Sequence, residues 1–440
     1  MMEMTAIIPG GQVPKGHVQV SGAKNAATLL MAAALLTRDP VHLDNFPTEL
    51  VDVRHKGGFL ERLGAQVAYD RDRQTIDLCA RELAAPEPSD DYTCPIRTTY
   101  LLAAGQLQRH GIARIPYPGG CKIGNRKYDL HIMVWERLGA SVRETDDYIE
   151  ITCPQLRGAE IVFPFPTIGG TANALLCAGI AHGVTVIRNA YISPEVNDLI
   201  QCLTAMGADI VCEGNSRITV TGKARLRGTS YRLIPDRIEA LTWIVYGILS
   251  GGEILIDPVP FDAMEVPLIH LREAGIDLFR NSRSVYISPS CMNAEQTIQP
   301  FEAATGTYPG IISDMQPFYV LLGLKADGVS RIIDYRYPER TAYLRELDKL
   351  CPGSISWNEH GQISVTGPAH FTGATMRSTD LRGSMAVLIG GLLAEGTSLV
   401  HNVEMALRGY NNLLEKLRGL GVTMHLYSPE ELREEQSVAA

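Results

Sequence analysis

The chain has 440 residues, of which 45% are hydrophobic and 20% are charged, and its formal net charge is −9. This composition is typical of a globular protein with substantial cores, and the length predicts two or three domains. The acidic balance argues against a nucleic-acid-binding surface, which needs an excess of basic residues. An anionic substrate is compatible with this charge, because local clusters of Arg and Lys matter more than the total.

Nine cysteines are spread along the chain without CxxC pairs or regular spacing. This arrangement predicts neither a disulfide framework nor a zinc site. The N-terminal stretch Met1–Gly11 lacks the basic and long apolar regions of a signal peptide, and the most apolar predicted helix, Ala26–Leu36, is too short to span a bilayer. We therefore expect a cytoplasmic protein that does not enter a membrane.

One pattern, a helix followed by a Leu-Gly-Ala-like tripeptide and a strand, recurs six times along the chain. Five copies are clear, and the copy at residues 347–355 is degraded. Each copy carries a glycine that we predict to close the helix in a left-handed conformation before the strand begins. These glycines, spaced by 68 to 78 residues, are Gly64, Gly139, Gly207, Gly275, Gly353 and Gly421.

A second predicted helix occurs once in each period and is apolar around most of its circumference. Because such a helix has no polar face to turn toward water, we expect it in the centre of a domain, with the amphipathic helix outside it. Short segments of alternating polarity, such as Arg217–Thr221 and Gln362–Thr366, are predicted to be strands. The six apolar helices are predicted to begin at Ser21, Pro95, Thr167, Pro235, Ser313 and Thr379.

The repeats predict an α/β fold of six units, each with two helices and several strands. Repeats of this length also build solenoids, but helices that are apolar on every face favour closed globules with helices inside and sheets outside. Three units per globule give two domains. We place the boundaries so that residues 1–22 and 232–430 form one domain, residues 23–231 form the other, and residues 431–440 form a tail.

The starts of the apolar helices carry most of the charged residues that stand out in the sequence. A helix start offers free N–H groups and a partial positive charge, so several starts together predict an anion site, to which Lys24, Arg97 and Arg382 add cations. Asp314 and Asp380 also have a structural interpretation, because an aspartate at a helix start is often an N-cap. Basic residues are unfavourable at helix starts, and their presence favours ligand binding.

The stretch Pro116–His131 sets Cys121 in a glycine-rich turn with three basic residues beside it. These cations would stabilise a thiolate and hold an anion, so Cys121 is the candidate for a reactive cysteine. The alternative is an ordinary surface loop with a free thiol. A Walker-type phosphate loop is excluded, because Asn125 and Arg126 stand where Lys and Ser or Thr are required.

Six segments, in order along the chain, resemble the enolpyruvyl transferases, most closely the UDP-N-acetylglucosamine 1-carboxyvinyltransferase (MurA) family. They are SGAKNA at 21–26, PGGCKIGNRKYDLH at 118–131, PDRIE at 235–239, SDMQ at 313–316, TDLR at 379–382 and RGY at 408–410. The resemblance covers residues 5–425, and the loop cysteine separates the chain from the related shikimate-pathway transferase. It implies a two-domain inside-out α/β barrel with three units per domain, in which sheets surround buried helices.

The resemblance also implies a reaction: the enolpyruvyl group of phosphoenolpyruvate moves to an acceptor hydroxyl through a tetrahedral ketal, and phosphate is released. Cys121 then matches the acid that forms a phosphoenolpyruvate adduct and is alkylated by fosfomycin, and Asp314 matches the base on the acceptor side. Neither a cofactor nor a metal is implied. The cations that hold phosphoenolpyruvate match Lys24, Arg126 and Arg408. The other implied substrate-binding residues are Asn25, Arg97, Asp129, His131, Thr167, Gly169, Arg340, Asp380 and Arg382.

The chain departs from the family pattern on the acceptor side. Ala172 stands where the family has a glutamate, and Phe165 stands where a basic residue is common. Further departures occur at Lys127, Pro338–Thr341 and Glu239–Thr242. Three hypotheses follow: transfer to the 3-hydroxyl of UDP-N-acetylglucosamine in peptidoglycan precursor synthesis, transfer to the 3′-hydroxyl of UMP in nucleoside antibiotic biosynthesis, or a non-catalytic nucleotide-binding protein.

Overall fold

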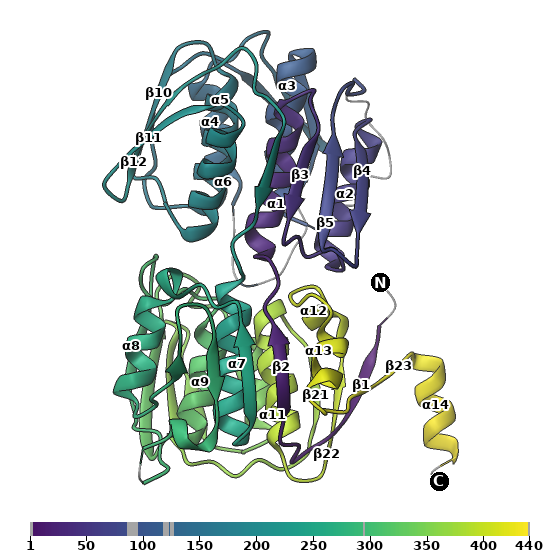
Figure 1. Cartoon of the computed structure of the whole chain (residues 1–440), viewed down its shortest axis with the longest axis vertical. Helices are drawn as coiled ribbons and strands as arrows, with labels where there is room; N and C mark the ends of the chain where they lie inside the picture. The colour runs from purple at the N-terminus through teal and green to yellow at the C-terminus, as the bar shows by residue number, and fades with distance from the viewer. Residues whose placement is uncertain (1–2, 86–95, 118–122, 124–126, 294, 439–440) are drawn as a thin grey trace. The chain divides into compact units, whose positions relative to one another are not determined.

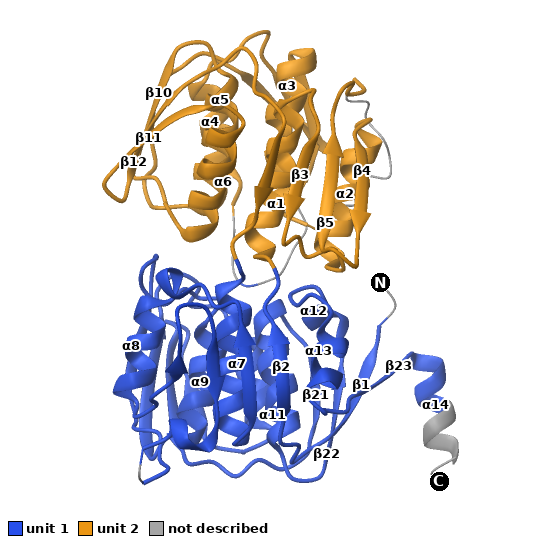
Figure 2. Cartoon of the chain, in the orientation of Figure 1, with its two compact units in different colours: residues 1–21, 121–125, 235–440 blue, residues 22–120, 126–234 orange. Residues whose placement is uncertain are grey.

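The computed structural model describes residues 3–85, 96–117, 123, 127–293 and 295–438 (Figure 1). The described chain divides into two compact units (Figure 2). Unit 1 contains residues 3–21, 123, 235–293 and 295–438, and unit 2 contains residues 22–85, 96–117 and 127–234. No helix in these ranges has the length and apolar character needed to cross a membrane.

Unit 2 contains three small sheets among its described residues, with strand orders β13-β3-β5-β4, β6-β8-β7 and β11-β12-β10-β9. The pairs β13–β3 and β10–β9 are parallel, and the other pairs are antiparallel. The strands are β3 (Val41–Asp44), β4 (Gln66–Asp70), β5 (Thr75–Cys79), β6 (Ile112–Pro116), β7 (Ser141–Glu144), β8 (Tyr148–Thr152), β9 (Glu160–Val162), β10 (Val184–Arg188), β11 (Asp209–Glu213), β12 (Arg217–Thr221) and β13 (Thr229–Arg232). The helices are α1 (Lys24–Ala33), η1 (Ala34–Leu36), α2 (Val51–Arg62), η2 (Thr98–Leu102), α3 (Ala103–His110), α4 (Asp129–Arg137), α5 (Ile168–Ile180) and α6 (Pro194–Ala205).

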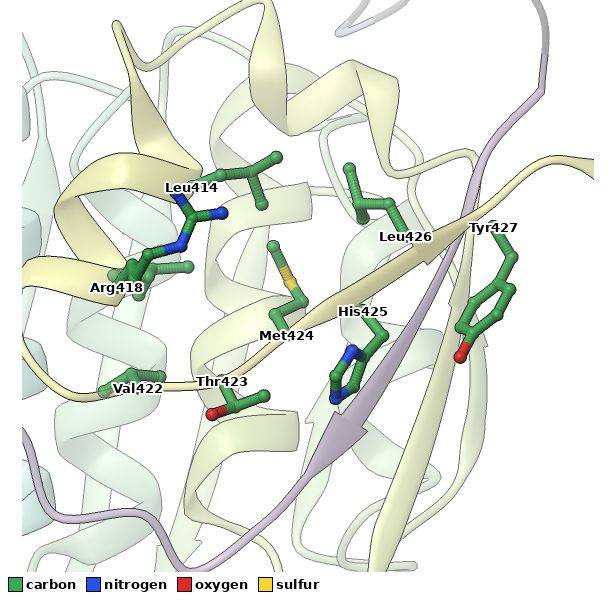
Figure 3. Close-up of a pocket in the computed structure, with 9 residues that line it drawn as sticks. Leu414, Arg418, Val422, Thr423, Met424, His425, Leu426 and Tyr427 are labelled. Atoms are coloured by element: carbon green, nitrogen blue, oxygen red, sulfur yellow. The ribbon is translucent and has the colours of Figure 1, made fainter.

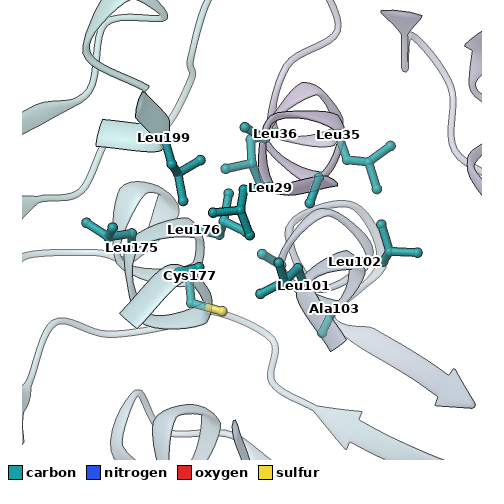
Figure 4. Packing of buried hydrophobic residues seen from close by; sticks show 14 of the residues in the cluster. Leu29, Leu35, Leu36, Leu101, Leu102, Ala103, Leu175, Leu176, Cys177 and Leu199 are labelled. Atoms are coloured by element: carbon teal, nitrogen blue, oxygen red, sulfur yellow. The ribbon is translucent and has the colours of Figure 1, made fainter. Parts of the chain in front are cut away.

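The centre of unit 2 is filled by α1, η2, α3 and α5, where α1 and α3 each contact both η2 and α5. Leu29 of α1, Leu101 of η2 and Leu176 of α5 meet there, and each is at most 3% exposed (Figure 4). Burial of a side chain of this size stabilises the fold by roughly 1.5–3 kcal/mol. As expected from its apolar circumference, α5 is buried without interruption from Gly170 to Gly179.

Unit 1 likewise contains three sheets in the part of it that is described, with strand orders β15-β16-β14-β2, β17-β18-β20-β19 and β21-β22-β1-β23. Each sheet combines one parallel pair (β14–β2, β17–β18 or β21–β22) with antiparallel pairs. The strands are β1 (Thr5–Pro9), β2 (Lys15–Gln19), β14 (Glu253–Asp257), β15 (Phe279–Arg280), β16 (Val285–Ile287), β17 (Glu302–Thr305), β18 (Gly328–Asp334), β19 (Ile355–Trp357), β20 (Gln362–Gly367), β21 (Thr375–Arg377), β22 (Thr397–His401) and β23 (His425–Tyr427). The helices are α7 (Arg237–Ser250), η3 (Phe261–Ala263), α8 (Glu265–Glu273), η4 (Pro289–Cys291), α9 (Gln316–Lys325), α10 (Ala342–Asp348), α11 (Leu381–Leu393), α12 (Glu404–Leu407), α13 (Leu413–Gly419) and α14 (Pro429–Val438).

The apolar helices α7, α9 and α11 contact one another in the core of unit 1. Trp243, Phe318 and Leu388, one from each helix, are all 0% exposed. The predicted burial of these helices is therefore confirmed, and their starts bring charged residues from distant parts of the sequence into one unit.

The glycine prediction is confirmed at five of the six repeats. In these five, the glycine directly follows the C-cap residue of α2, α4, α6, α8 or α13, and its φ lies between 71° and 98°. Glycine adopts this left-handed conformation at little cost, which closes the helix. At Gly353 the left-handed conformation is present, with a φ of 83°, but the prediction that it closes the helix is wrong, because it lies in a turn four residues after Lys349, the C-cap of α10. Cys351 and Pro352 of the degraded copy separate this glycine from the helix.

Several apolar helices begin later than predicted. Helix α1 begins at Lys24 rather than Ser21, and α9 begins at Gln316 rather than Ser313. The segment expected to begin at Pro95, which lies outside the described residues, is a 3₁₀ helix from Thr98 and becomes α-helical at Ala103. The later start of α9 leaves the SDMQ aspartate in the turn before the helix.

A pocket of about 430 Å³ lies between α13 and β23 in unit 1 (Figure 3). Leu414 and Arg418 line it from α13, and Met424 and Leu426 line it from β23 and the residue before that strand. None of the residues that the sequence predicts for a substrate site lines this pocket.

Candidate functional site

Two aspartates of unit 1 cap central helices. The Asp236 side chain accepts hydrogen bonds from the backbone N–H groups of Ile238 (2.8 Å) and Glu239 (3.1 Å) at the start of α7. Asp380 accepts bonds from the second and third residues of α11, each at 3.1 Å. The interpretation of Asp380 as an N-cap is thus confirmed, and a cap contributes about 1 kcal/mol to helix stability.

Asp314 has a different environment, because Met315 stands at the N-cap position of α9 and no side chain caps this helix. The Asp314 carboxylate lies 3.0 Å from Nη1 of Arg340 and 3.8 Å from Nε of Arg382. Its side chain is 30% exposed, whereas the two arginine side chains are 2% exposed. A carboxylate that is held by guanidinium groups and still reaches solvent is available to a bound ligand.

Arg340 joins the Asp314 turn to the start of α11. Its Nη1 donates to the Ser313 carbonyl at 2.8 Å and to Asp314 at 3.0 Å, and its Nη2 donates to Asp380 at 2.5 Å. Burial lowers the pKa of this guanidinium, but the charges of Asp380 and Asp314 raise the pKa by more, so it lies above the ordinary value. Arg340 therefore stays charged and fixes both carboxylates.

Arg382 extends this network to the start of α7. Its Nη2 lies 3.6 Å from Asp236, its Nη1 donates to the Gly409 carbonyl at 3.2 Å, and its guanidinium carbon lies 5.0 Å from the centre of the Tyr410 ring. Burial raises the pKa of Tyr410 to about 12, so its hydroxyl is neutral and bonds Thr242 at 2.9 Å. Five charged groups thus alternate in sign in the order Asp380, Arg340, Asp314, Arg382 and Asp236, and we call them the charge chain.

A carboxylate that sequence reasoning missed, Asp334, organises the turn that carries Asp314. It is 0% exposed and accepts hydrogen bonds from the hydroxyls of Thr305 (2.7 Å) and Ser313 (2.9 Å) and from the Gln316 amide (3.3 Å). The backbone N–H groups of Arg336 and Tyr337, in the turn after β18, also donate to Asp334. These bonds hold the residues on both sides of Asp314.

Arg408 lies at the C-cap of α12 and is 7% exposed. Its Nη1 lies 3.9 Å from the Met405 sulfur. The next residue, Gly409, supplies the carbonyl that Arg382 binds, so the RGY segment is attached to the charge chain. The structure therefore brings Asp314, Arg340, Asp380 and Arg382 together in unit 1 and places Arg408 beside their last contact.

Unit 2 holds the first predicted cation, Lys24, at the first residue of α1. Its ammonium lies 2.8 Å from the carboxylate of Asp52, and these side chains are 13% and 7% exposed. Asp52 lies in the first turn of α2 and was missed by sequence reasoning, because the pair forms between two helix starts that are 28 residues apart. Asn25 follows Lys24 on α1 and is partly buried.

His131 is held in an aromatic stack. Its ring lies 4.5 Å from the Tyr100 ring at an interplanar angle of 29°, and 6.2 Å from the Trp135 ring. Burial, and then the charge of Arg97, lower the pKa of His131 to about 3. The imidazole is therefore neutral at physiological pH and can bind a substrate only as a neutral donor or acceptor. Arg97 itself donates to the backbone carbonyl of Lys127.

The start of α5 faces this histidine. Thr167 is the N-cap, and its hydroxyl accepts a hydrogen bond from Gly170 N–H at 3.4 Å. A Cβ atom placed on Gly169 would lie 3.3 Å from Cε1 and Nε2 of His131, so the ring packs directly on the helix start. Asp129 is exposed at the first residue of α4, two positions before His131. The structure thus brings His131, Thr167 and Gly169 together.

Cys121 and Arg126, predicted to be the acid and one of the cations, lie outside the described residues. Among the residues that are described, no group of three or more His, Cys, Asp or Glu side chains is arranged to hold a metal ion.

The chemistry available from the described residues is anion binding and proton transfer. Unit 1 offers one partly exposed carboxylate held by two charged arginines. Unit 2 offers a lysine, an arginine and a neutral histidine at or beside the starts of α1, η2 and α5. Fixed cations of this kind suit phosphate and carboxylate groups, and a positioned carboxylate suits removal of a proton from a hydroxyl.

Comparison with known proteins gives concordant results. The family described as EPSP synthase (3-phosphoshikimate 1-carboxyvinyltransferase) matches residues 9–417. The UDP-N-acetylglucosamine 1-carboxyvinyltransferase of Koribacter versatilis is 38% identical over 94% of this chain and 94% of its own length. The enzyme of the same name from Methylocella silvestris is 37% identical over 96% of this chain and 99% of its own.

Solved structures are similar over the same extent. The enolpyruvyl transferase NikO from Streptomyces tendae has a TM-score of 0.87 and 26% sequence identity, and the match covers 97% of this chain and 100% of that chain. An EPSP synthase from Acinetobacter baumannii has a TM-score of 0.73 at 18% identity, which shows a shared mixed α/β fold alone.

Proposed function

This chain belongs to the enolpyruvyl transferase family, and from that membership we propose its acceptor, the roles of its residues and its place in the cell. The chain is an enzyme that transfers the enolpyruvyl group from phosphoenolpyruvate. The acceptor that we propose is the 3-hydroxyl of UDP-N-acetylglucosamine, a step in peptidoglycan precursor synthesis in the cytoplasm. The observation that carries this proposal is 37–38% identity, over nearly the whole chain, to two transferases named for that acceptor.

A second candidate acceptor is the 3′-hydroxyl of UMP, in nucleoside antibiotic biosynthesis. It is favoured by the departures from the family pattern on the acceptor side, where Ala172 stands in place of a glutamate and Phe165 in place of a basic residue. The TM-score of 0.87 to NikO is consistent with a paralogue of this kind, since fold similarity alone does not fix the substrate. The third hypothesis, a non-catalytic nucleotide-binding protein, is disfavoured by membership of an enzyme family.

We assign proton transfer to two residues. Asp314 takes the proton of the acceptor hydroxyl, whose oxygen then bonds to C2 of phosphoenolpyruvate, while Cys121 gives its proton to the C3 methylene. Loss of a proton from C3 and departure of phosphate from the resulting ketal give the enolpyruvyl product. The role of Asp314 is supported by its partial exposure and by the Arg340 contact at 3.0 Å, which fixes the carboxylate before the substrate arrives.

The cations have an electrostatic role. Lys24, Arg126 and Arg408 hold the phosphate and carboxylate of phosphoenolpyruvate and offset the charge that develops in the ketal. Arg97 belongs to the same basic shell, and the charge chain of unit 1 keeps Asp314 in position. Asn25, Asp129, His131, Thr167 and Gly169 are proposed contacts of the uridine nucleotide.

The finer description of the fold is part of the proposal. In it, each domain is an inside-out α/β barrel of three repeated units, with sheets around buried helices. It is supported by three sheets in each unit and by the burial of α5, α7, α9 and α11 in the described part of the chain.

The test is phosphate release from phosphoenolpyruvate with UDP-N-acetylglucosamine, UDP-glucose, UMP and uridine offered separately. Turnover with UDP-N-acetylglucosamine alone is expected, and turnover with UMP alone would replace it by the second candidate. Absence of phosphate release with all four compounds would contradict both proposed acceptors. Cys121→Ser should abolish or strongly impair the release without loss of fold, and an unchanged rate would contradict the role of Cys121.

A further inference from the structure

A lysine of unit 2 that has no part in the proposed chemistry is fully buried. Lys56 lies on α2 and is 0% exposed. Lysine is rarely buried to this degree, because an ammonium loses its hydration and must replace those hydrogen bonds inside the protein. Methionine or leucine would fill the same space without that cost, so packing alone does not explain a lysine here.

The Lys56 ammonium joins three helices. It donates to the backbone carbonyl of Thr28 in α1 at 2.5 Å and to the backbone carbonyl of Thr98 in η2 at 3.1 Å. Its own backbone belongs to α2. One charged group therefore holds α1, α2 and η2 at a common point, through bonds stronger than those between neutral groups.

The site residues of unit 2 lie next to the three points that this ammonium joins. Lys24 lies one helical turn before Thr28 on α1, and Arg97 directly precedes Thr98. Asp52 lies one turn before the buried lysine on the same face of α2, and it pairs with Lys24 at 2.8 Å. Any change in the spacing of α1, α2 and η2 therefore moves Lys24, a proposed phosphoenolpyruvate ligand, relative to Arg97 of the same basic shell.

We propose that Lys56 is a positioning residue for phosphoenolpyruvate, which fixes the distance between Lys24 and Arg97. Its charge also offsets that of Asp52, so that the positive charge of Lys24 is left for the substrate anion. The inference rests on the proposed function, in which Lys24 holds phosphoenolpyruvate and Arg97 belongs to the same basic shell. Small displacements of such groups have large effects, because they disturb a prearranged geometry.

The test compares Lys56→Met with the wild-type chain, because methionine keeps an unbranched apolar stem and removes the ammonium. We expect the KM for phosphoenolpyruvate to rise about tenfold, and the KM for the acceptor to change by less than about threefold. Direct binding of phosphoenolpyruvate, measured by calorimetry without acceptor, should weaken by the same factor. The melting temperature should fall, because loss of the ammonium leaves the buried carbonyls of Thr28 and Thr98 without this donor, so binding is measured well below it.

Lys325→Met is the matched control. Lys325 ends α9 in unit 1, is half-buried, and also donates to a backbone carbonyl, that of Ala369, at 2.9 Å. It lies at the end of α9 opposite to Asp314. This variant should leave both KM values unchanged. Two results would make Lys56 a packing residue and overturn the proposal. One is an equal rise of the KM for phosphoenolpyruvate in both lysine variants, and the other is an equal rise of both KM values in Lys56→Met.

The binding measurement separates this inference from the proposed function. If the wild-type chain binds phosphoenolpyruvate but releases no phosphate, the proposed function is contradicted. The ratio of the dissociation constants for phosphoenolpyruvate in Lys56→Met and wild type, measured by calorimetry, still tests the role of Lys56. Weakened phosphate release without weakened phosphoenolpyruvate binding in Lys56→Met overturns the inference alone, and a wild-type chain that does not bind phosphoenolpyruvate overturns both. If Lys56→Met fails to fold, Lys56→Gln takes its place, because its amide keeps N–H donors without the charge. We expect a smaller rise of the KM for phosphoenolpyruvate in this variant, and the absence of any rise overturns the inference.

Discussion

The two units hold their proposed substrate-binding residues by different means. In unit 1, charges are held by charges: four members of the charge chain are at most 5% exposed, and Asp314 alone reaches solvent. In unit 2, Lys24 pairs with an aspartate, and His131, which lies in an aromatic stack, is kept neutral by burial. The stability of unit 1 should therefore depend on every charged partner being present, whereas that of unit 2 should depend on the His131 ring remaining uncharged.

Asp314→Asn probes the exposed end of the charge chain and should have the largest effect. The amide keeps the size of the side chain but cannot take a proton, so kcat should fall about 10²- to 10⁴-fold. Phosphoenolpyruvate binding and the melting temperature should change little. The measurement is phosphate release with the best acceptor, and Asp262→Asn, an exposed aspartate of unit 1, is the control. A variant that retains wild-type kcat would remove Asp314 from the mechanism.

Arg340→Met probes the buried middle of the charge chain. Loss of this guanidinium leaves Asp380 as a buried carboxylate without its charged partner, so the free energy of unfolding should fall by about 3–5 kcal/mol. Arg340→Lys should restore only part of it, because an ammonium lacks the planar fork that reaches two carboxylates. Urea unfolding measures both variants. If Lys24→Met in unit 2 destabilises as much as Arg340→Met, the contrast between the units fails.

The neutral histidine of unit 2 predicts a pH dependence of stability. The pKa of His131 is about 3 in the folded protein, whereas an unfolded histidine titrates near 6.5, so the unfolded chain binds the extra proton. The stability that depends on this group is complete above pH 6.5 and is lost as the pH falls toward 3, by at most about 1.4 kcal/mol per pH unit. Urea unfolding of wild type and His131→Gln between pH 4.5 and 7.5 measures it. The variant should have the flatter profile, and parallel profiles would exclude a neutral His131.

A second histidine of unit 2 should respond with the opposite sign and a smaller size. The hydrogen bond to Asp77 raises the pKa of His42, against a smaller effect of burial. Its contribution is therefore complete below the unfolded pKa near 6.5 and is lost as the pH rises through the folded pKa. Because the side chain is 37% exposed, solvent screening limits the effect to less than about 1 kcal/mol. His42→Asn should lower stability at pH 5.5 and leave it unchanged at pH 9, and the reverse order would contradict the Asp77 contact.

The parts of the fold that could be predicted from the sequence are those with a local cause. The six copies of the repeat place a helix end and a strand at the same offset, and the glycine at that offset has a local backbone reason in five of them. Asp380 was found for the same reason, since an N-cap bonds N–H groups two and three residues away. The same interpretation was wrong for Asp314, because Met315 stands at the N-cap position of α9. Where the local signal was broken, as by Cys351 and Pro352 before Gly353, the prediction was wrong.

The partners of the site residues could not be predicted, because their contacts join segments that are far apart in the chain. Asp52 meets Lys24 across 28 residues, and Asp334 meets Ser313 across 21. Lys56 reads as an ordinary surface lysine, with Gly57 and Gly58 after it, and only the packing of α2 buries it. The roles of Cys121 and Arg126 remain predictions, and the Cys121→Ser variant tests the first of them.

Strand β1 gives the chain an order of assembly. It pairs with β22 on one side and β23 on the other, so the first of the described strands joins a sheet whose other strands come last among them. The described strands of unit 2 are all present once Ile234 has left the ribosome, whereas β23 ends roughly 190 residues later, about 10–40 s at ordinary rates of synthesis. Until β22 (Thr397–His401) is synthesised, β1 has neither of its partner strands and exposes two unpaired edges. Unit 2 can therefore be complete while the β21-β22-β1-β23 sheet of unit 1 is still unformed.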